Sequence, residues 1–260
     1  MNRYSVTDLL KLKEQGNKIA AITCYDFFTA KAIQDADIPV ALVGDSASML
    51  VYGYNSTVPI SMDEIILLLR AVVRGNAKSF IVADMPFMSY QASVKHAVNN
   101  AGKLIKEGGA TAVKLEGGSI IKDQIKAILD AGIPVVGHLG LLPQSINKLG
   151  RYSIQAKSES EQTKLMDDAL LLESLGVCSL ILECIPSQLA YKVSSSLSIP
   201  TIGIGAGLEC DGQIQVFHDL VGLGSDHYPK HSTQYENIGS LVENALAKYK
   251  ADIVNGDFKV

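Results

Sequence analysis

The 260-residue sequence contains no tryptophan, and aromatic residues make up only 6% of it. No apolar run approaches the ~20 residues that a membrane-spanning helix needs, so we expect no association with a membrane. Lysine and arginine form no stripe, and 23 basic residues against 27 acidic ones give a net charge of −4. Because nucleic-acid binding requires a concentrated basic surface, the sequence predicts no nucleic-acid partner.

Cysteine is also scarce, with four residues and no CxxC spacing. Cys24, Cys178 and Cys184 lie within or at the ends of apolar runs, where a free cysteine behaves as a small core residue. The first residues lack the uninterrupted apolar segment of a secretory signal peptide. We therefore expect a cytoplasmic protein with reduced thiols.

Short apolar runs recur along the whole chain and alternate with amphipathic segments. The runs are almost continuously apolar, which is typical of strands covered on both faces in a parallel sheet. The strand predictions are residues 19–23, 40–43, 80–83, 112–115, 134–138, 179–182, 201–204 and, less clearly, 215–217. The helix predictions between them are residues 29–36, 62–76, 94–106, 120–131, 159–175 and 187–197.

Eight strand candidates with intervening helices favour an α/β fold, namely a closed (βα)₈ TIM barrel. No linker divides the chain, so we expect a single domain over residues 1–260 with a C-terminal amphipathic helix near residues 241–250. The polar segment 147–160 is interpreted as a loop over the mouth of the barrel. Residues 211–213 are interpreted as a turn that leads into the eighth strand.

Acidic side chains follow four of the predicted strands: Asp45, Asp84, Glu116 and Glu183. A single aspartate after a strand is most often a helix cap or a turn residue. Four such acids at the ends of parallel strands, however, would gather at the C-terminal face of a barrel, where active sites are built. Because gathered carboxylates repel one another, they indicate a hard divalent cation and an oxygen-rich substrate.

Three further polar residues accompany these acids. Ser46 follows Asp45 and is placed to receive a substrate carboxylate. Lys114 interrupts an apolar run, which indicates a buried partner for surplus negative charge or for an anionic substrate, against the alternative of a surface lysine. His138 ends a predicted strand, and its three possible roles are a metal ligand, a structural residue and, as we favour, a hydrogen-bond donor to substrate.

Together, several sequence blocks resemble the ketopantoate (3-methyl-2-oxobutanoate) hydroxymethyltransferase family. The matching blocks stand in the family's order at residues 23–26, 43–46, 83–87, 113–118, 137–144, 200–207, 210–214 and 229–230. The glycine-rich block 203–207 alone resembles half of a dinucleotide-binding motif, but its spacing is wrong for one, and close backbone approach at the barrel mouth is the favoured interpretation.

The resemblance implies a (βα)₈ barrel that assembles as a homo-oligomer, a decamer in several members. It implies transfer of a hydroxymethyl group from 5,10-methylenetetrahydrofolate, a co-substrate, to 3-methyl-2-oxobutanoate through a metal-stabilised enolate, which gives 2-dehydropantoate for pantothenate biosynthesis. It also assigns the site residues: Asp45, Asp84 and Glu116 for Mg²⁺ or a similar divalent cation, Asp45, Ser46, Asp84, Lys114 and His138 for the 2-oxo acid, and Glu183 as the catalytic base.

Two alternatives stay open at this point. One is another Mg²⁺-dependent, enolate-forming C–C lyase or mutase-type barrel enzyme that acts on a 2-oxo acid, although the reactive-cysteine loop expected of that class is not found in this sequence. The other is a barrel without catalytic activity. Tyr54 and His231 depart from the family pattern, which bears on folate contact and subunit packing more than on the reaction.

Overall fold

The computed structural model describes residues 3–224, 229 and 231–258. Met1, Asn2, His227 and Lys230 therefore lie outside the described residues. The chain divides into two compact units, the first ending at Ile214 and the second beginning at Gln215. The single-domain interpretation of residues 1–260 stays a prediction.

Eight parallel strands form a closed barrel in the order of the sequence, which confirms the predicted fold class. The strands are nearly all buried on both faces, as the continuously apolar runs predicted. They are β1 (Ile19–Thr23), β2 (Val40–Val43), β3 (Phe80–Asp84), β4 (Ala112–Glu116), β5 (Val135–Gly140), β6 (Ser179–Glu183), β7 (Thr201–Ile204) and β8 (Gly212–Gln215).

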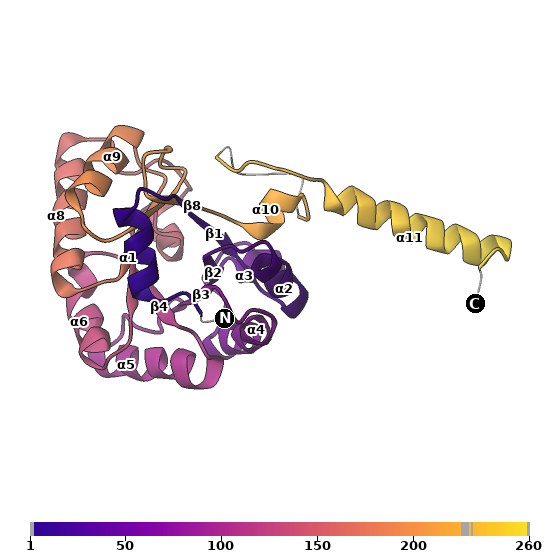
Figure 1. The fold of residues 1–260 in the computed structure, drawn as a ribbon, viewed down its shortest axis with the longest axis horizontal. Coiled ribbons are helices and arrows are strands. Elements are labelled where there is room, and N and C mark those ends of the chain that lie inside the picture. The colour runs from indigo at the N-terminus through magenta and orange to yellow at the C-terminus, as the bar shows by residue number, and fades with distance from the viewer. Residues whose placement is uncertain (1–2, 225–228, 230, 259–260) are drawn as a thin grey trace. The chain divides into compact units, whose positions relative to one another are not determined.

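Helices connect consecutive strands from β1 to β7 on the outside of the barrel, and a segment without a helix connects β7 to β8 (Figure 1). Helix α4 buries one apolar face, and several of the helices begin at serine or aspartate caps, such as Ser61 of α4 and Asp26 of α2. The elements are α2 (Phe27–Asp35), α3 (Ala47–Leu50), α4 (Met62–Gly75), α5 (Val94–Lys103), the π-helical turn η1 (Leu104–Gly108), the 3₁₀ turn η2 (Ser119–Ile121), α6 (Lys122–Asp130), the 3₁₀ turn η3 (Pro143–Ser145), α7 (Ile146–Leu149), α8 (Glu159–Leu175) and α9 (Ser187–Ser196).

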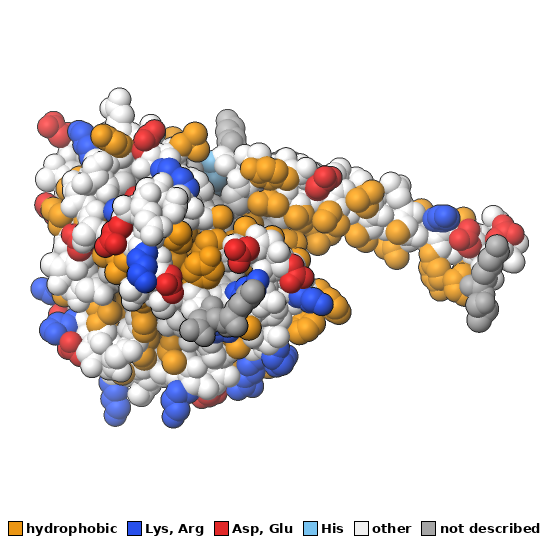
Figure 2. All heavy atoms as spheres, in the orientation of Figure 1, with side chains coloured by type: hydrophobic (Ala, Val, Ile, Leu, Met, Phe, Trp, Pro, Cys, Tyr) orange, Lys and Arg blue, Asp and Glu red, His pale blue; other side chains and the backbone are white. Residues whose placement is uncertain are grey.

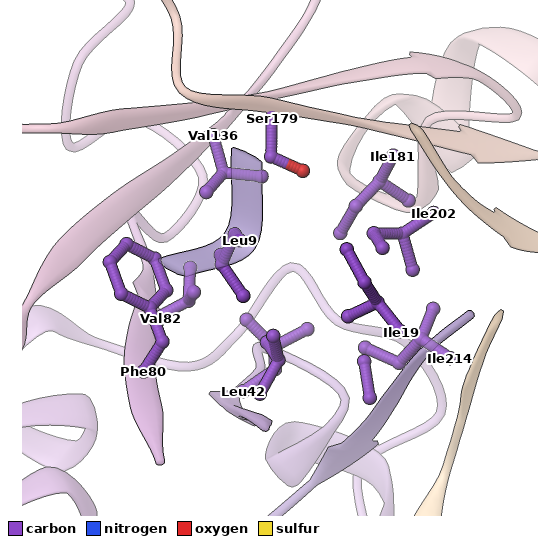
Figure 3. A pocket seen from close by; sticks show the side chains of 12 residues that line it. Leu9, Ile19, Leu42, Phe80, Val82, Val136, Ser179, Ile181, Ile202 and Ile214 are labelled. Atoms are coloured by element: carbon purple, nitrogen blue, oxygen red, sulfur yellow. The ribbon is translucent and has the colours of Figure 1, made fainter. Parts of the chain in front are cut away.

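The N-terminal end of the barrel is filled by apolar side chains and by helix α1 (Val6–Glu14). Leu9 of this helix is 3% exposed and packs among the first residues of several strands, including Ile19 and Phe80. A small apolar cavity remains between them (Figure 3). This end of the barrel is therefore hydrophobic core, and the polar residues of the barrel collect at the opposite end.

The eighth strand was predicted wrongly. Strand β8 covers Gly212–Gln215, whereas residues 215–217 were expected, and Asp211 is the only residue of the expected turn 211–213 that precedes the strand. A glycine is required at position 212 because a Cβ there would lie 2.2 Å from the carbonyl oxygen of Ile19. The close approach of β8 to β1 thus explains a residue that looked like part of a turn.

Helix α1 was not predicted, although its start carries a clear signal. Ser5 and Asp8 form a reciprocal capping box in which the backbone N–H of Ser5 donates to Asp8 at 2.9 Å. The segment 147–160 is mostly irregular, as expected, except for the end of α7 and the start of α8.

The second unit contains α10 (Phe217–Val221) and α11 (Ile238–Asn255), and α11 includes the predicted helix at residues 241–250. Among the described residues, no helix combines the length and the apolar character needed to cross a membrane. On the face of the first unit that Figure 2 shows, acidic and basic side chains are interspersed.

Candidate active site

The four predicted acids lie at one end of the barrel. Asp84, Glu116 and Glu183 are the last residues of β3, β4 and β6, and Asp45 stands two residues after β2. Because all strands are parallel, these positions share the C-terminal face. Asp45, Asp84 and Glu116 are buried, and the side chain of Glu183 is 15% exposed.

Asp45 and Asp84 are directly linked. The backbone N–H of Asp45 donates to Oδ2 of Asp84 at 2.9 Å, which holds the turn after β2 against the end of β3. Burial, and then the charge of Asp84, raise the pKa of Asp45 to about 7. The carboxyl group of Asp45 therefore takes up a proton at a much higher pH than an exposed aspartate does. A positive charge close to it would favour the ionised form.

Lys114 supplies one such charge from strand β4. Its Nζ lies 3.1 Å from Oδ1 of Asp84, its register partner on β3, and its side chain is 5% exposed. Burial alone would lower the pKa of Lys114, but the charges of Asp84 and Glu116 outweigh this effect and raise it. Lys114 is therefore a buried ammonium, which excludes the alternative of a surface lysine.

His138 lies between Lys114 and Glu183. Its Nδ1 is 3.1 Å from Nζ of Lys114, and its Nε2 is 3.2 Å from Oε2 of Glu183. Because an ammonium group only donates hydrogen bonds, Nδ1 must accept, and the ring proton is assigned to Nε2, on the side of Glu183. Burial and the neighbouring Lys114 lower the pKa of His138 well below its usual value, so the ring is neutral.

Glu116 faces the same space from the end of β4, where His138 of β5 is its register partner. Burial, followed by the charge of Asp45, raises the pKa of Glu116 well above its usual value. Its Oε2 accepts the backbone N–H of Gln144 at 3.0 Å. Its Oε1 is buried and accepts no hydrogen bond from the described residues, and Nδ1 of His138 lies 3.7 Å away.

The structure also brings in three residues that the sequence reasoning missed. The Tyr25 hydroxyl shares a hydrogen bond of 2.7 Å with Oγ of Ser46, while the Tyr90 hydroxyl and the Gln144 amide bond each other at 2.9 Å. Tyr25 and Gln144 fall within the blocks 23–26 and 137–144, which is the signal that could have identified them. Nothing in the sequence around Tyr90 marks it.

The donor set suits a hard divalent cation. Three carboxylates share one buried end of the barrel, two of them have raised pKa values, and one carboxylate oxygen of Glu116 has no hydrogen-bond donor among the described residues. In the described part of the chain, no three histidine, cysteine, aspartate or glutamate side chains are arranged closely enough to hold a metal ion in their present conformations. The residues therefore fit such an ion in chemistry, and binding requires side-chain adjustment.

The glycine-rich segment 203–207 includes the last two residues of β7 and continues into the loop at the same end of the barrel. Gly207 has a φ of +83°, and a Cβ there would lie 2.5 Å from Cβ of Ser187. Close backbone approach, as expected from the sequence, explains this glycine. All four cysteines are buried and free, in agreement with the prediction for Cys24, Cys178 and Cys184.

Comparison with known proteins points to one family. The model of the family described as ketopantoate hydroxymethyltransferase matches residues 3–259. The 3-methyl-2-oxobutanoate hydroxymethyltransferase of Carboxydothermus hydrogenoformans is 48% identical over 99% of this chain and 94% of its own length. The protein of the same name from Moorella thermoacetica is 49% identical, over 99% of this chain and 96% of its own length.

Solved structures with low sequence identity share the fold. A phosphonopyruvate hydrolase in complex with oxalate and Mg²⁺ has a TM-score of 0.62 at 12% identity, and the match covers 97% of this chain and 88% of that one. A 2,3-dimethylmalate lyase has a TM-score of 0.59 at 15% identity, with 95% and 85% covered. At this identity, the likeness concerns the fold alone.

Proposed function

Because the chain belongs to the ketopantoate hydroxymethyltransferase family, we propose that it transfers a hydroxymethyl group from 5,10-methylenetetrahydrofolate to 3-methyl-2-oxobutanoate, and that the residues gathered at the C-terminal end of the barrel carry this reaction. The methylene carbon of the folate, with an oxygen from water, becomes the hydroxymethyl group of 2-dehydropantoate. Tetrahydrofolate is the second product.

Asp45, Asp84 and Glu116 would hold Mg²⁺ or a similar divalent cation. When bound, the cation supplies positive charge that polarises the keto group of the substrate. The raised pKa values of Asp45 and Glu116 support this assignment, because carboxylates that crowd one another favour a positive partner. The phosphonopyruvate hydrolase binds oxalate and Mg²⁺, a small dicarboxylate with adjacent oxygens and a hard cation, which is a similar pair of ligands.

Lys114, Ser46 and His138 would bind and orient the 2-oxo acid, together with Asp45 and Asp84. Lys114 brings a permanent positive charge to an anionic substrate, and its burial strengthens that attraction. The Ser46 hydroxyl is held by Tyr25 at 2.7 Å and is placed to donate to a substrate carboxylate. The neutral ring of His138 offers its Nε2 proton without adding a charge.

Glu183 would act as the general base that removes the proton from C3 of the substrate. Its side chain is the most exposed of the four acids, at 15%, as a base that must meet a substrate carbon requires. The electron pair left on C3 passes to the keto oxygen and forms an enolate. This nucleophile then attacks the methylene carbon of the folate.

The observation that carries the proposal is the buried ammonium of Lys114, held at 3.1 Å from Asp84 and 3.1 Å from His138 among acids at the ends of four strands. The test is product formation. Purified protein with Mg²⁺, 3-methyl-2-oxobutanoate and 5,10-methylenetetrahydrofolate should yield 2-dehydropantoate, followed by NMR, and chelation of the metal should stop turnover. Cleavage of a 2-oxo acid without folate would instead favour the lyase alternative.

The variants Asp45→Asn and Asp84→Asn test the cation site within this proposal. Each removes one negative charge while nearly preserving shape, so calorimetry should show that Mg²⁺ and 2-oxo acid affinities fall together. Affinities that match those of the unaltered protein in both variants would exclude these ligands. We also infer assembly into a homo-oligomer, which sedimentation analysis would test.

A further inference from the structure

We infer that Gln144 is a positioning residue that binds one oxygen of Asp45 and one of Glu116 and thereby leaves the other oxygen of each acid for the cation. This inference deepens the proposed function and rests on it. Gln144 is 4% exposed and lies in the turn η3, just after β5. No role follows for it from the sequence alone.

The side-chain amide of Gln144 uses all of its hydrogen-bonding capacity. Its Nε2 donates to Oδ2 of Asp45 at 2.9 Å and to the carbonyl oxygen of Met85 at 3.0 Å. Its Oε1 accepts from the Tyr90 hydroxyl at 2.9 Å and from Nε2 of Gln91 at 3.3 Å. Two donors and two acceptor positions are thus filled, which is the full complement of a glutamine amide.

These partners also fix the orientation of the amide. If the amide were turned over, Oε1 would face the carboxylate of Asp45 and the carbonyl of Met85, two acceptors that offer it no hydrogen. The Tyr90 hydroxyl accepts the backbone N–H of Glu116 at 3.1 Å, and it lies nearer to Oε1 of Gln144, at 2.9 Å, than to its other acceptor, the carbonyl oxygen of Glu116, at 3.2 Å. The donor side of Gln144 therefore always points at Asp45.

The backbone of Gln144 reaches the second acid. Its N–H donates to Oε2 of Glu116 at 3.0 Å, while Oε1 of the same carboxylate is buried without a hydrogen bond from the described residues. A buried carboxylate oxygen without a donor is costly unless a ligand supplies one. One residue thus binds acids from two non-adjacent strands, β2 and β4, and selects which oxygen of each is presented.

The turn that carries Gln144 is itself anchored. The backbone N–H of Leu141 donates to the carbonyl oxygen of Glu183 at 2.8 Å, which fixes the start of the turn to the end of β6. Pro143, at the first position of η3, restricts φ directly before Gln144. The position of the amide is therefore set by strands β5 and β6, and it does not depend on a cation for its placement.

The variant Gln144→Met tests this inference because it keeps the side-chain length and the backbone N–H but removes the amide. We expect Mn²⁺, used as the probe ion in calorimetry, to bind about 10- to 100-fold more weakly, the range found when partners of metal ligands are removed. The affinity for 3-methyl-2-oxobutanoate should fall with it, while KM for the folate stays unchanged. A merely structural role would not produce that selective pattern.

Gln162→Met is the matched control. Within the described part of the chain, the side-chain amide of Gln162 donates to the carbonyl oxygen of Lys157, at 3.5 Å, near the start of α8. Mn²⁺ binding in this control should match that of the unaltered protein. If Gln144→Met is folded by circular dichroism and binds Mn²⁺ as tightly as the control, the inference is wrong.

Tyr90→Phe provides a second route if Gln144→Met does not fold. It removes the hydroxyl that orients the Gln144 amide and leaves the amide in place, so we expect a weaker loss of Mn²⁺ affinity, about 3- to 10-fold, for one neutral hydrogen bond. Unchanged affinity in a folded Tyr90→Phe protein would overturn the inference. Where both variants fold, the double variant should lose less Mn²⁺ affinity than the two single losses combined, because Tyr90 acts partly through the Gln144 amide and partly through its hydrogen bond to the backbone N–H of Glu116.

The outcomes separate this inference from the proposed function. If the unaltered protein binds Mn²⁺ but makes no 2-dehydropantoate, the proposed reaction fails, while the affinity difference between Gln144→Met and Gln162→Met still decides the role of Gln144. If product forms but the unaltered protein binds no divalent ion, the role of Gln144 fails and the hydroxymethyl transfer stands.

Discussion

Nε2 of His138 lies 3.2 Å from Oε2 of Glu183, on the side of the ring opposite to the Lys114 ammonium. The Lys114 ammonium donates to Nδ1 of His138, so the ring proton is on Nε2. Burial and the charge of Lys114 lower the pKa of His138, so the ring is neutral. Nε2 is buried and makes no hydrogen bond to a described residue, so its proton remains available to a substrate oxygen beside the proposed base. The imidazole thus links the residue that would bind substrate charge to the one that would remove a proton.

Glu183→Gln should abolish proton exchange at C3 of 3-methyl-2-oxobutanoate while binding of Mg²⁺ and the 2-oxo acid persists. Loss of a general base lowers rates by about 10²- to 10⁴-fold. Deuterium incorporation from D₂O, followed by NMR, measures the exchange. Glu107→Gln, which alters an exposed residue 3.7 Å from Arg70, is the control and should exchange normally. Undiminished exchange in Glu183→Gln would remove Glu183 from the mechanism.

Cation binding should depend on pH because burial and the charge of Asp84 raise the pKa of Asp45 to about 7. A group with a raised acid pKa holds its proton in the metal-free protein below that value, and a cation must displace it. Between about pH 6 and pH 8, Mg²⁺ affinity should therefore rise with pH, and binding should release protons. Calorimetry in buffers of different ionisation enthalpy measures the release. If Mg²⁺ binding released no protons anywhere in this pH range, the raised pKa of Asp45 would be contradicted.

The same shift predicts the stability of the metal-free protein. Since the folded state binds the proton of Asp45 more tightly than the unfolded state does, the contribution of this group favours folding below about pH 4 and is lost as pH rises through about 7. Asp45→Asn should flatten the dependence of the urea midpoint on pH over this interval. An identical pH dependence in the variant and the unaltered protein would be the contrary result.

Gly140→Ala should damage both stability and activity. Gly140 has a φ of +97°, and a Cβ there would lie 2.2 Å from the carbonyl oxygen of Glu183. We expect a loss of about 1–3 kcal/mol and at least a tenfold drop in kcat/KM, because the turn that carries Gln144 would move away from β6. Gly132→Ala isolates the conformational cost, since Gly132 has a φ of +82° with no atom within 4 Å of the added Cβ. Equal effects in the two variants, by urea unfolding and turnover, would exclude the steric explanation.

Leu9→Ala should reduce stability without changing the reaction. Leu9 is 3% exposed and packs at the N-terminal end of the barrel, opposite to the candidate site. Removing a buried leucine side chain costs about 2–5 kcal/mol, as measured by urea unfolding. Leu67→Ala, at a position that is 61% exposed on α4, is the control and should leave the unfolding midpoint nearly unchanged. A changed KM in Leu9→Ala would indicate coupling between the two ends.

Local sequence patterns were sufficient for most of the barrel. The run Val40–Val43 is apolar at every position and buried at every position, so its pattern and its environment agree. Strand β8 failed because Gly212 and Gln213 resemble a turn, while their place in the sheet depends on contact with Ile19 far away in the chain. Burial between distant segments is not encoded in local periodicity.

The candidate site also contains residues that local sequence patterns locate and residues that they do not. The acids Asp84 and Glu116 could be located because strand ends of a parallel barrel share one face. Gln144 lies within the block 137–144, but no role could be assigned to it, because its partner Asp45 is 99 residues away and a glutamine after a proline carries no chemical signal of its own. Hydrogen-bond partners of this kind depend on the side-chain geometry of the folded state.

The candidate site is particularly sensitive to a shift in the register of strand β4. Lys114 and Glu116 stand two residues apart and so project to the same side of the sheet, with Asp84 and His138 as their register partners. A one-residue insertion or deletion in β4 before Lys114 would shift the register of both residues and turn the cationic and the anionic group to the other side of the sheet together. During divergence, length changes in this enzyme should therefore accumulate in its connecting segments, and β4 should tolerate replacement of residues far better than any change in their number.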